Sequence, residues 1–173
     1  MSHPRHRGRR ALAAGAAAFA AALAPAAAAQ DLAIDDVEIT QAIRFFSTPT
    51  IADNVTFVRV FVETPDTDEP VPDVDAVLEV FIDGVEAEFS PIRSINGPIV
   101  SPSLPSADDL NDHLNFWFIA PEAEDVQFRV VLNPALRVPE TDLSNNVWES
   151  TFPTDFECRA EVDVVYVPID YQP

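Results

Sequence analysis

The sequence predicts an all-β protein, specifically an Ig-like antiparallel β-sandwich of about seven strands. Apolar residues recur at every second position in most segments, which is the period of a strand with one buried face. The sequence contains sixteen prolines and no long helical period, which excludes an α-helical domain. Asp83-Gly84 stands between two alternating runs, where this dipeptide favours a tight hairpin. A closed β-barrel is the alternative architecture.

Residues 1–29 are predicted to be a cleaved signal peptide. Four arginines precede an alanine-rich apolar run, and a series of small residues ends at Ala29, which is the order found in export signals. The apolar run is short for a membrane span. A Sec signal is favoured over a twin-arginine signal, although Arg9-Arg10 is present. We expect a secreted or cell-surface protein whose mature chain begins at Gln30 and does not span a membrane.

The predicted mature chain is strongly acidic. Removing residues 1–29 takes away four of the ten arginines and none of the 29 acidic residues, so the formal charge falls from −19 to −23. The sequence contains no lysine, so every remaining positive charge belongs to an arginine. Binding of nucleic acid needs a cationic surface, and this composition excludes it.

The first two expected strands show the alternation clearly. In the first, Val37 and Ile39 face one side while Glu38 and Thr40 face the other. The second covers residues 55–63, where apolar side chains occur on both faces. We therefore expect this second strand to lie at the centre of a sheet.

The later strands are separated by turn residues. Residues 76–82 and 85–89 are expected to form a hairpin, since a type I′ turn at Asp83-Gly84 needs positive φ at both central positions. Only residues 106–112 could form a helical turn, started by Ser106. The remaining expected strands are 114–119, 126–132, 147–152 and 162–168. The predicted domains are a sandwich in residues 30–153 and a C-terminal strand in residues 154–173 that joins a partner or a further domain.

The core is expected to form around aromatic side chains in the predicted strands. Each buried large apolar side chain contributes roughly 1.5–3 kcal/mol, so half of them would stabilise the domain without a disulfide. These anchors are Phe57, Phe61, Phe81, Phe89, Phe116, Trp117, Phe118, Phe128, Trp148 and Phe152. Cys158 is the only cysteine, so it can form no internal disulfide, and we expect it to be buried.

Catalysis is not expected. One histidine and one cysteine remain in the mature chain, which excludes a two-histidine zinc motif and a cysteine-rich metal site. His113 would need a nucleophile and an orienting acid beside it, and the sequence contains no nucleophile-elbow pattern. We therefore predict a non-enzymatic protein without a cofactor, in which His113 lies at a strand edge.

Residues 130–150, VVLNPALRVPETDLSNNVWES, resemble the last strand pair of CARDB domains, the cell-adhesion-related Ig-like domains of bacteria. These domains carry an early Asn or Asp, an acidic pair, and then Asn-Asn before the final strand. The matching positions are Asn133, Glu140, Asp142, Asn145 and Asn146. The resemblance implies an Ig-like fold and an adhesive role. Considered alone, the paired asparagines fit a tight hairpin corner.

A longer resemblance covers most of the mature chain. Its segments are VEITQAI at 37–43, TFVRVFV at 56–62, INGPIVSPS at 95–103, DLNDHLNFWF at 109–118 and VVYVPIDY at 164–171. They are similar to N-terminal Ig-like regions of large secreted bacterial proteins, some of which continue into zinc metalloprotease domains. The resemblance implies an accessory role without its own chemistry, and leaves open that the chain is a fragment.

Several acidic clusters are candidates for calcium binding, because calcium takes carboxylate and carbonyl oxygens. None has the loop spacing of an EF-hand, and we favour the interpretation that they are solvated loop charges. The candidates are Asp66, Asp68, Asp73, Asp75, Glu140, Asp142 and Asn145.

Trp117 is the expected surface contact. The period of two puts Phe116 and Phe118 on one face of their strand and Trp117 on the other. We predict a non-catalytic adhesion or spacer module that contacts a protein partner or an adjoining domain. The alternatives are the front region of a secreted zinc metalloprotease and a carbohydrate-binding module that stacks sugars on Trp117.

Overall fold

The computed structural model describes residues 30–41 and 50–159. The predicted signal peptide and the strand expected at 162–168 lie outside these residues. Within them the chain forms strands and turns, and no helix there is long and apolar enough to cross a membrane. The strands are β1 (Ala33–Thr40), β2 (Thr50–Ile51), β3 (Val55–Glu63), β4 (Val71–Val74), β5 (Ala76–Ile82), β6 (Val85–Glu86), β7 (Ile92–Arg93), β8 (Ile99–Ser101), β9 (His113–Ile119), β10 (Ala123–Leu132), β11 (Val147–Glu149) and β12 (Thr154–Glu157).

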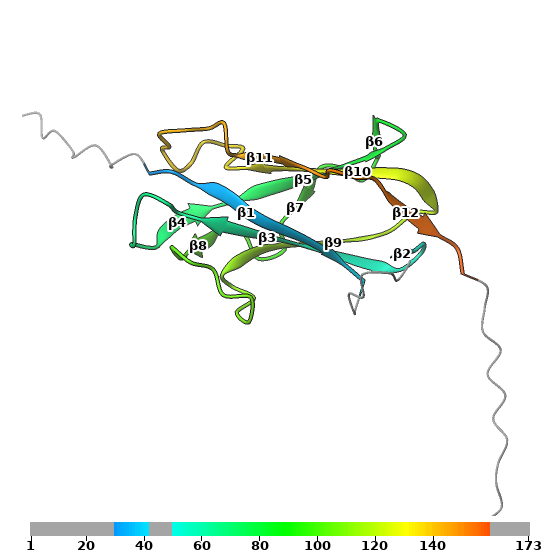
Figure 1. Cartoon of the computed structure of the whole chain (residues 1–173), viewed down its shortest axis with the longest axis horizontal. Coiled ribbons are helices and arrows are strands. Elements are labelled where there is room, and N and C mark those ends of the chain that lie inside the picture. The colour runs from blue at the N-terminus through cyan, green and yellow to red at the C-terminus, as the bar shows by residue number, and fades with distance from the viewer. Residues whose placement is uncertain (1–29, 42–49, 160–173) are drawn as a thin grey trace, which may run out of the picture.

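Two sheets face each other and form the predicted all-β sandwich (Figure 1). The first has the order β1-β3-β9, with β3 antiparallel to both neighbours. The prediction that residues 55–63 form a central strand is therefore confirmed. Alternate residues of β3, from Thr56 to Val62, are completely buried against the second sheet.

The second sheet is built on the antiparallel pair β5 and β10. Strands β11 and β12 pair with β10, while β6 and β7 pair with β5. Asp83 and Gly84 join β5 to β6 with φ of 51° and 74°. Both values are positive, so the predicted hairpin at this dipeptide is confirmed. Strand β6 ends at Glu86 rather than at Phe89, since the chain turns at residues 87–90.

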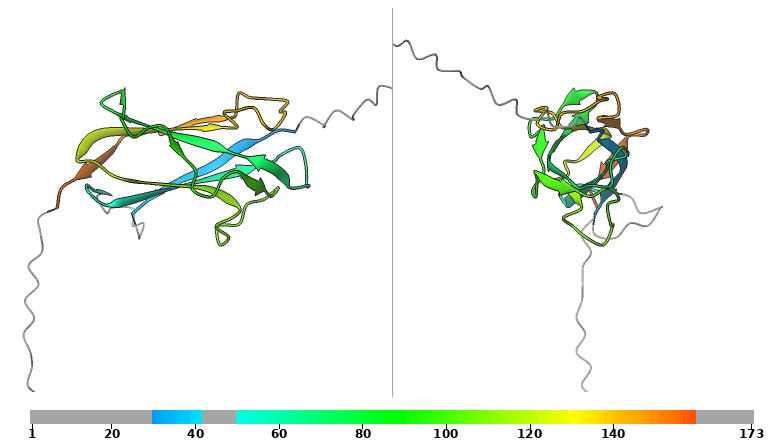
Figure 2. Two further views of the ribbon diagram at one scale, coloured as in Figure 1. Left: turned by 180° about the vertical axis from the view of Figure 1, so that it is seen from behind. Right: turned by 90° about the vertical axis from the view of Figure 1, so that its left-hand side faces the viewer.

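The core lies between the two sheets, and the end-on view in Figure 2 shows the strands arranged around it. Phe118 is in contact with Phe128 and Phe156 across this interior, at ring-centroid distances of 5.9 and 6.2 Å. Four of the predicted anchors, however, are exposed: Phe57, Phe89, Trp117 and Phe152. The aromatic residues of β3 and β9 are therefore divided between an inner and an outer face.

Two strand pairings fall where the sequence indicated turns. Strands β4 and β8 pair with each other in a small separate sheet, although prolines flank and interrupt them. β12 pairs with β10 and β2, and Phe156 on it is buried. The second sheet therefore continues past residue 153, where the sequence placed the end of the sandwich.

Two local expectations differ from the structure. Residues 106–112 form successive turns rather than a helical turn, with Asp109 N–H donating to the Ser106 carbonyl at 3.2 Å. Cys158 is exposed rather than buried, because it follows β12 at a point where the chain has already left the core. The burial prediction for Cys158 was therefore wrong.

Candidate functional site

The outer faces of the two sheets differ in chemistry. On the seven-stranded sheet, Arg129 of β10 stands between Glu79 of β5 and Glu149 of β11, its direct cross-strand neighbours. Its side-chain nitrogens lie 3.1 Å from a Glu79 carboxylate oxygen and 3.5 Å from a Glu149 carboxylate oxygen. Opposite charges paired across strands are typical of a sheet surface that faces water.

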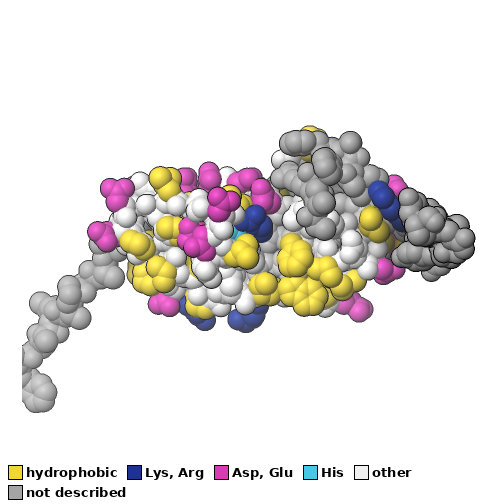
Figure 3. All heavy atoms as spheres, turned by 90° about the horizontal axis from the view of Figure 1, so that it is seen from below, with side chains coloured by type: hydrophobic (Ala, Val, Ile, Leu, Met, Phe, Trp, Pro, Cys, Tyr) yellow, Lys and Arg dark blue, Asp and Glu magenta, His cyan; other side chains and the backbone are white. Residues whose placement is uncertain are grey.

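The outer face of the sheet β1-β3-β9 is apolar over half of its length. Val55 pairs with Ile119 across β3 and β9, and Phe57 pairs with Trp117. These four side chains, which we call the apolar face, are 36%, 49%, 42% and 46% exposed in that order. Figure 3 views this side of the molecule and shows hydrophobic side chains gathered over it. The prediction that Trp117 points outward agrees with this arrangement.

The other half of the same outer face is covered by the loop between β8 and β9. Arg59 of β3 donates to the Ala107 carbonyl of this loop at 2.6 Å. Beneath the loop, the rings of Phe61 and His113 lie 4.9 Å apart and both are buried. The loop thus divides the outer face into a covered part and the open apolar face.

A groove of about 360 Å³ runs along the boundary between the loop and the apolar face. It is lined by Thr40, Phe57, Arg59, Ile95, Asn96, Leu110, Asn111 and Asn115. Its polar groups are largely engaged within the protein: Asn96 Nδ2 donates to the His113 carbonyl at 2.9 Å, and Asn115 Nδ2 donates to the Leu110 carbonyl at 2.8 Å. The groove therefore offers a ligand mainly apolar contact.

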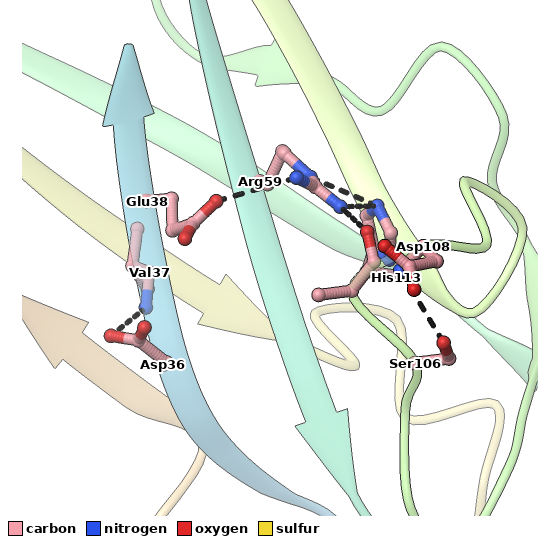
Figure 4. A network of polar contacts seen from close by, with 8 residues as sticks. Asp36, Val37, Glu38, Arg59, Ser106, Asp108 and His113 are labelled. Atoms are coloured by element: carbon pink, nitrogen blue, oxygen red, sulfur yellow. Dashed lines mark hydrogen bonds and ion pairs between the residues drawn. The ribbon is translucent and has the colours of Figure 1, made fainter. Parts of the chain in front are cut away.

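His113 belongs to a structural cluster with Arg59 and Glu38 (Figure 4). Arg59 Nε donates to His113 Nε2 at 3.0 Å, and Arg59 Nη1 lies 3.4 Å from a Glu38 carboxylate oxygen. Because Nε2 accepts this hydrogen bond, the imidazole is neutral and carries its proton on Nδ1. Burial and then the Arg59 charge lower the pKa of His113, while Asp112, Asp109 and Glu38 raise it.

This cluster predicts a specific pH dependence of stability. The unfolded chain binds a proton at His113 near pH 6.5, whereas the folded chain resists it until lower pH. Stability should therefore fall as the pH drops below 6.5 and should not change through this group above it. Urea unfolding between pH 5 and 7.5 should show a steeper loss for the native protein than for His113→Gln, whose amide oxygen can still accept from Arg59. Equal slopes would contradict this assignment.

The candidate calcium residues are not brought together as a metal site. Within the described ranges, no group of three or more His, Cys, Asp or Glu side chains is placed to hold a metal ion. Asp66 and Asp68 are exposed in the loop after β3, and Asp73 is exposed on β4. Asp75 accepts hydrogen bonds from Ala76 N–H and from the Ser94 hydroxyl. Asp142 is exposed and accepts from Ser144 N–H at 2.8 Å, which lowers its pKa.

Glu140 instead organises the long connection between β10 and β11. One of its carboxylate oxygens accepts from the side-chain amides of Asn133 and Asn146, both of which are buried. The other oxygen accepts from Leu32 N–H at 3.3 Å. Nearby, the side-chain amide of Asn145 donates to the Asp31 carboxylate at 3.2 Å. We call the hydrogen bonds that Glu140 accepts from Asn133, Asn146 and Leu32 the Glu140 clip.

The Glu140 clip gives a structural role to most of the positions that resembled CARDB domains. Asn133 adopts a positive φ of 48°, and its side-chain oxygen accepts from Arg137 N–H at 2.8 Å. Beside the clip, the segment that leads into β1 is also held, since Gln30 N–H donates to the Pro139 carbonyl and Gln30 O accepts from Thr141 N–H, each at 3.0 Å. These residues fix the loop between β10 and β11 against the segment that leads into β1.

Comparisons with known proteins bear on the family. No protein-family model matches the sequence, and no curated protein matches it. Three chains among solved structures match. One is the CARDB domain of a Pyrococcus furiosus protein, solved in complex with di-metal ions; the match covers 75% of this chain and 96% of that one, with 17% identity and a TM-score of 0.41.

Sequence reasoning found one of the four side chains of the apolar face, Trp117. It assigned Phe57 to the core and did not single out Val55 or Ile119. The signal was present, because residues 55–63 carry apolar side chains on both faces, and only one face of a two-layer sandwich can be buried.

Proposed function

We propose that this chain is an exported, non-catalytic module that makes protein–protein or domain–domain contacts through the apolar face. The observation that carries the proposal is the exposure of Val55, Phe57, Trp117 and Ile119 as two adjacent cross-strand pairs. Contiguous exposed apolar side chains on a soluble protein mark interaction sites. Aromatic residues such as Trp117 are enriched among residues that dominate binding energy.

The contrast between the two outer faces supports this proposal. The face with Arg129, Glu79 and Glu149 carries paired charges, which suit permanent contact with water. In an exported chain with a formal charge of −23, the apolar face contrasts with this charged surface. Selection for solubility alone would favour polar side chains there.

Export is supported by the sequence of residues 1–29. A basic start, an alanine-rich apolar run and a small-residue end have the order of a signal peptide. Expression of the full chain in a bacterium should release a protein that begins at Gln30, which N-terminal sequencing or mass spectrometry would establish. Retention of residues 1–29 on the cytoplasmic protein would contradict export.

A carbohydrate-binding role is the second candidate, because the Trp117 indole is exposed on the flat outer side of a sheet. Sugar recognition combines an apolar surface with hydrogen bonds to hydroxyl groups. Asn96 and Asn115 beside the apolar face already donate to backbone carbonyls, so we favour a protein contact. A panel of glycans tested against the native protein and Trp117→Ala separates these candidates: binding that disappears in the variant favours sugars.

The contact proposal is tested with two double variants of the exported protein. Phe57→Ser with Trp117→Ser removes the centre of the apolar face, while Val85→Ser with Phe152→Ser removes two exposed apolar side chains that lie elsewhere. A protein retained by the native chain from the envelope or medium of the producing bacterium would be identified, purified and titrated by calorimetry. The first variant should bind at least about tenfold more weakly, and the second should bind as the native chain does.

Two outcomes would contradict this function. Equal affinity of both double variants would show that the apolar face is not the contact surface. A true partner should be retained both by the native chain and by the Val85 and Phe152 double variant. If no protein is retained by both, the result would count against a protein partner.

A further inference from the structure

Strand β9 has an open edge beside the apolar face. Ala120 pairs toward β3, since its N–H donates to the Asn54 carbonyl at 3.0 Å and its carbonyl accepts from Asp53 N–H at 2.8 Å. Asn115 points the opposite way: its carbonyl accepts from Ile95 N–H at 2.8 Å and its N–H donates to Asn96 Oδ1 at 3.0 Å. Backbone groups of successive residues in a strand point to opposite sides.

This alternation assigns a direction to the remaining backbone groups of β9. Trp117 and Ile119 follow Asn115 by two and four residues, so their backbone N–H and C=O groups point to the same side as those of Asn115, away from β3. Within the described ranges, none of these four groups has a hydrogen-bond partner. An unpaired row of this kind at the edge of a sheet is a template for another extended backbone.

An apolar pocket of about 370 Å³ lies directly beside this edge. Phe89 and Ile92 form its far side, and Phe118, stacked on Phe89 at 5.7 Å between ring centroids, adjoins the core. Ile92 belongs to β7, which pairs with β5 of the opposite sheet. After β7 the chain reaches the edge of β9 at Ile95, whose N–H donates to the Asn115 carbonyl at 2.8 Å.

We propose that the β9 edge at Trp117 and Ile119 binds an extended peptide, which adds a strand to the sheet β1-β3-β9. This inference rests on the proposed function, because it names the kind of partner that the apolar face contacts. Alternate side chains of such a strand point to opposite sides. One set enters the pocket formed by Phe89 and Ile92, and the other lies next to the Trp117 indole.

The charge of the chain specifies the side chains of this partner. The exported protein, which lacks residues 1–29, has a formal charge of −23, and this charge repels acidic peptides and a second copy of the same chain and attracts basic peptides. A lysine beside the exposed Trp117 indole gains a cation–π contact. The partner is therefore a segment in which apolar residues that enter the pocket alternate with basic residues.

The probe for this site is an acetylated and amidated eight-residue peptide of alternating valine and lysine. Its binding to the exported protein would be followed by tryptophan fluorescence and calorimetry. N-methylation at the valines and N-methylation at the lysines remove N–H donors from opposite edges of the peptide. One methylated form should bind as the parent does, and the other should bind at least about tenfold more weakly. Equal behaviour of the two forms would overturn strand addition.

A matched pair of protein variants tests the same edge from the other side. Ile119→Pro removes an outward N–H that makes no bond within the described sheet, a change that edge strands tolerate, whereas Ile119→Ala removes the side chain and keeps the N–H. Ile119→Pro should weaken the peptide about tenfold beyond Ile119→Ala, with folding checked by circular dichroism. Equal weakening by the two variants would overturn the proposal.

A glutamate version of the peptide tests the charge argument, and it should bind at least about tenfold more weakly than the lysine version at low salt. Equal binding would overturn the basic partner. If the lysine peptide does not bind the native chain while the Phe57 and Trp117 double variant still loses its protein partner, the strand-addition inference fails and the proposed function stands. If the peptide binds and that double variant keeps its protein partner, the proposed function fails instead.

Discussion

Phe116→Ala is expected to lower the free energy of unfolding by about 3–5 kcal/mol, the range found when a large core side chain is removed. Phe116 lies on the inner side of β9 and is completely buried. Its removal leaves a cavity between the two sheets that neighbouring side chains on paired strands fill only partly. Urea or guanidinium unfolding measures the loss. The slope of the free energy of unfolding against denaturant concentration should be the same in the variant as in the native protein, so that the shift in midpoint reports stability.

Trp117→Ala is the matched control, because Trp117 is the next residue on the same strand and faces outward. Its indole is about half exposed and pairs with Phe57 across the strands, so its removal leaves no closed cavity and should lower the free energy of unfolding clearly less than Phe116→Ala does. A larger loss for Trp117→Ala than for Phe116→Ala would reverse the assignment of the inner and outer faces of β9. It would also remove the basis for the apolar face.

Glu140→Ala is expected to destabilise the protein by about 2–4 kcal/mol. The substitution leaves two buried side-chain amides without an acceptor, and each unpaired amide costs about 1–3 kcal/mol. These amides belong to Asn133 and Asn146, which are 2% and 4% exposed. The variant also frees Leu32 N–H at the start of the sandwich. Unfolding in urea measures the loss, and hydrogen exchange should show faster exchange at residues 30–32.

Asp142→Ala serves as the control for Glu140→Ala. Asp142 lies in the same connection, is exposed, and among the described residues accepts a hydrogen bond from Ser144 alone, so its removal should leave the free energy of unfolding nearly unchanged. Similar losses for the two variants would show that the Glu140 clip does not hold the connection.

The strands with strong alternation could be predicted from the sequence. Residues 55–63 became β3 with the predicted bounds and central position. The turn at Asp83-Gly84 followed from the φ values that its two residues tolerate. Both signals are local, since they depend on neighbouring side chains and on backbone sterics.

Signals that depend on distant contacts were missed. Strands β4 and β8 contain or adjoin prolines that resemble turns, yet a proline is tolerated in a strand whose N–H needs no partner. Strand β12 has a single buried apolar residue, Phe156, so its sequence shows no alternation of apolar and polar residues. Cys158 is exposed because of where β12 ends, which no local pattern reports.

The candidate site was predictable only in part. Trp117 was placed outward by its period, but pairing of Phe57 with Trp117 depends on the register of β3 and β9. The positions resembling CARDB domains were considered for calcium, whereas the structure uses Glu140 to bind amides. His113 was expected at a strand edge; it begins the edge strand β9, and a loop held by Arg59 buries it, which the sequence did not indicate. In each case the partner lies far away in the sequence.

The most direct test of the account is the solvent exposure of Trp117 in the free protein. The chain has two tryptophans, so Trp148→Phe leaves Trp117 as the only indole, and Trp117→Phe leaves the half-buried Trp148 for comparison. With an open apolar face, Trp117 should emit at the longer wavelength and be readily quenched by acrylamide. Short-wavelength emission protected from acrylamide would show that the apolar face is already covered in the free protein, which would contradict its role as an open contact surface.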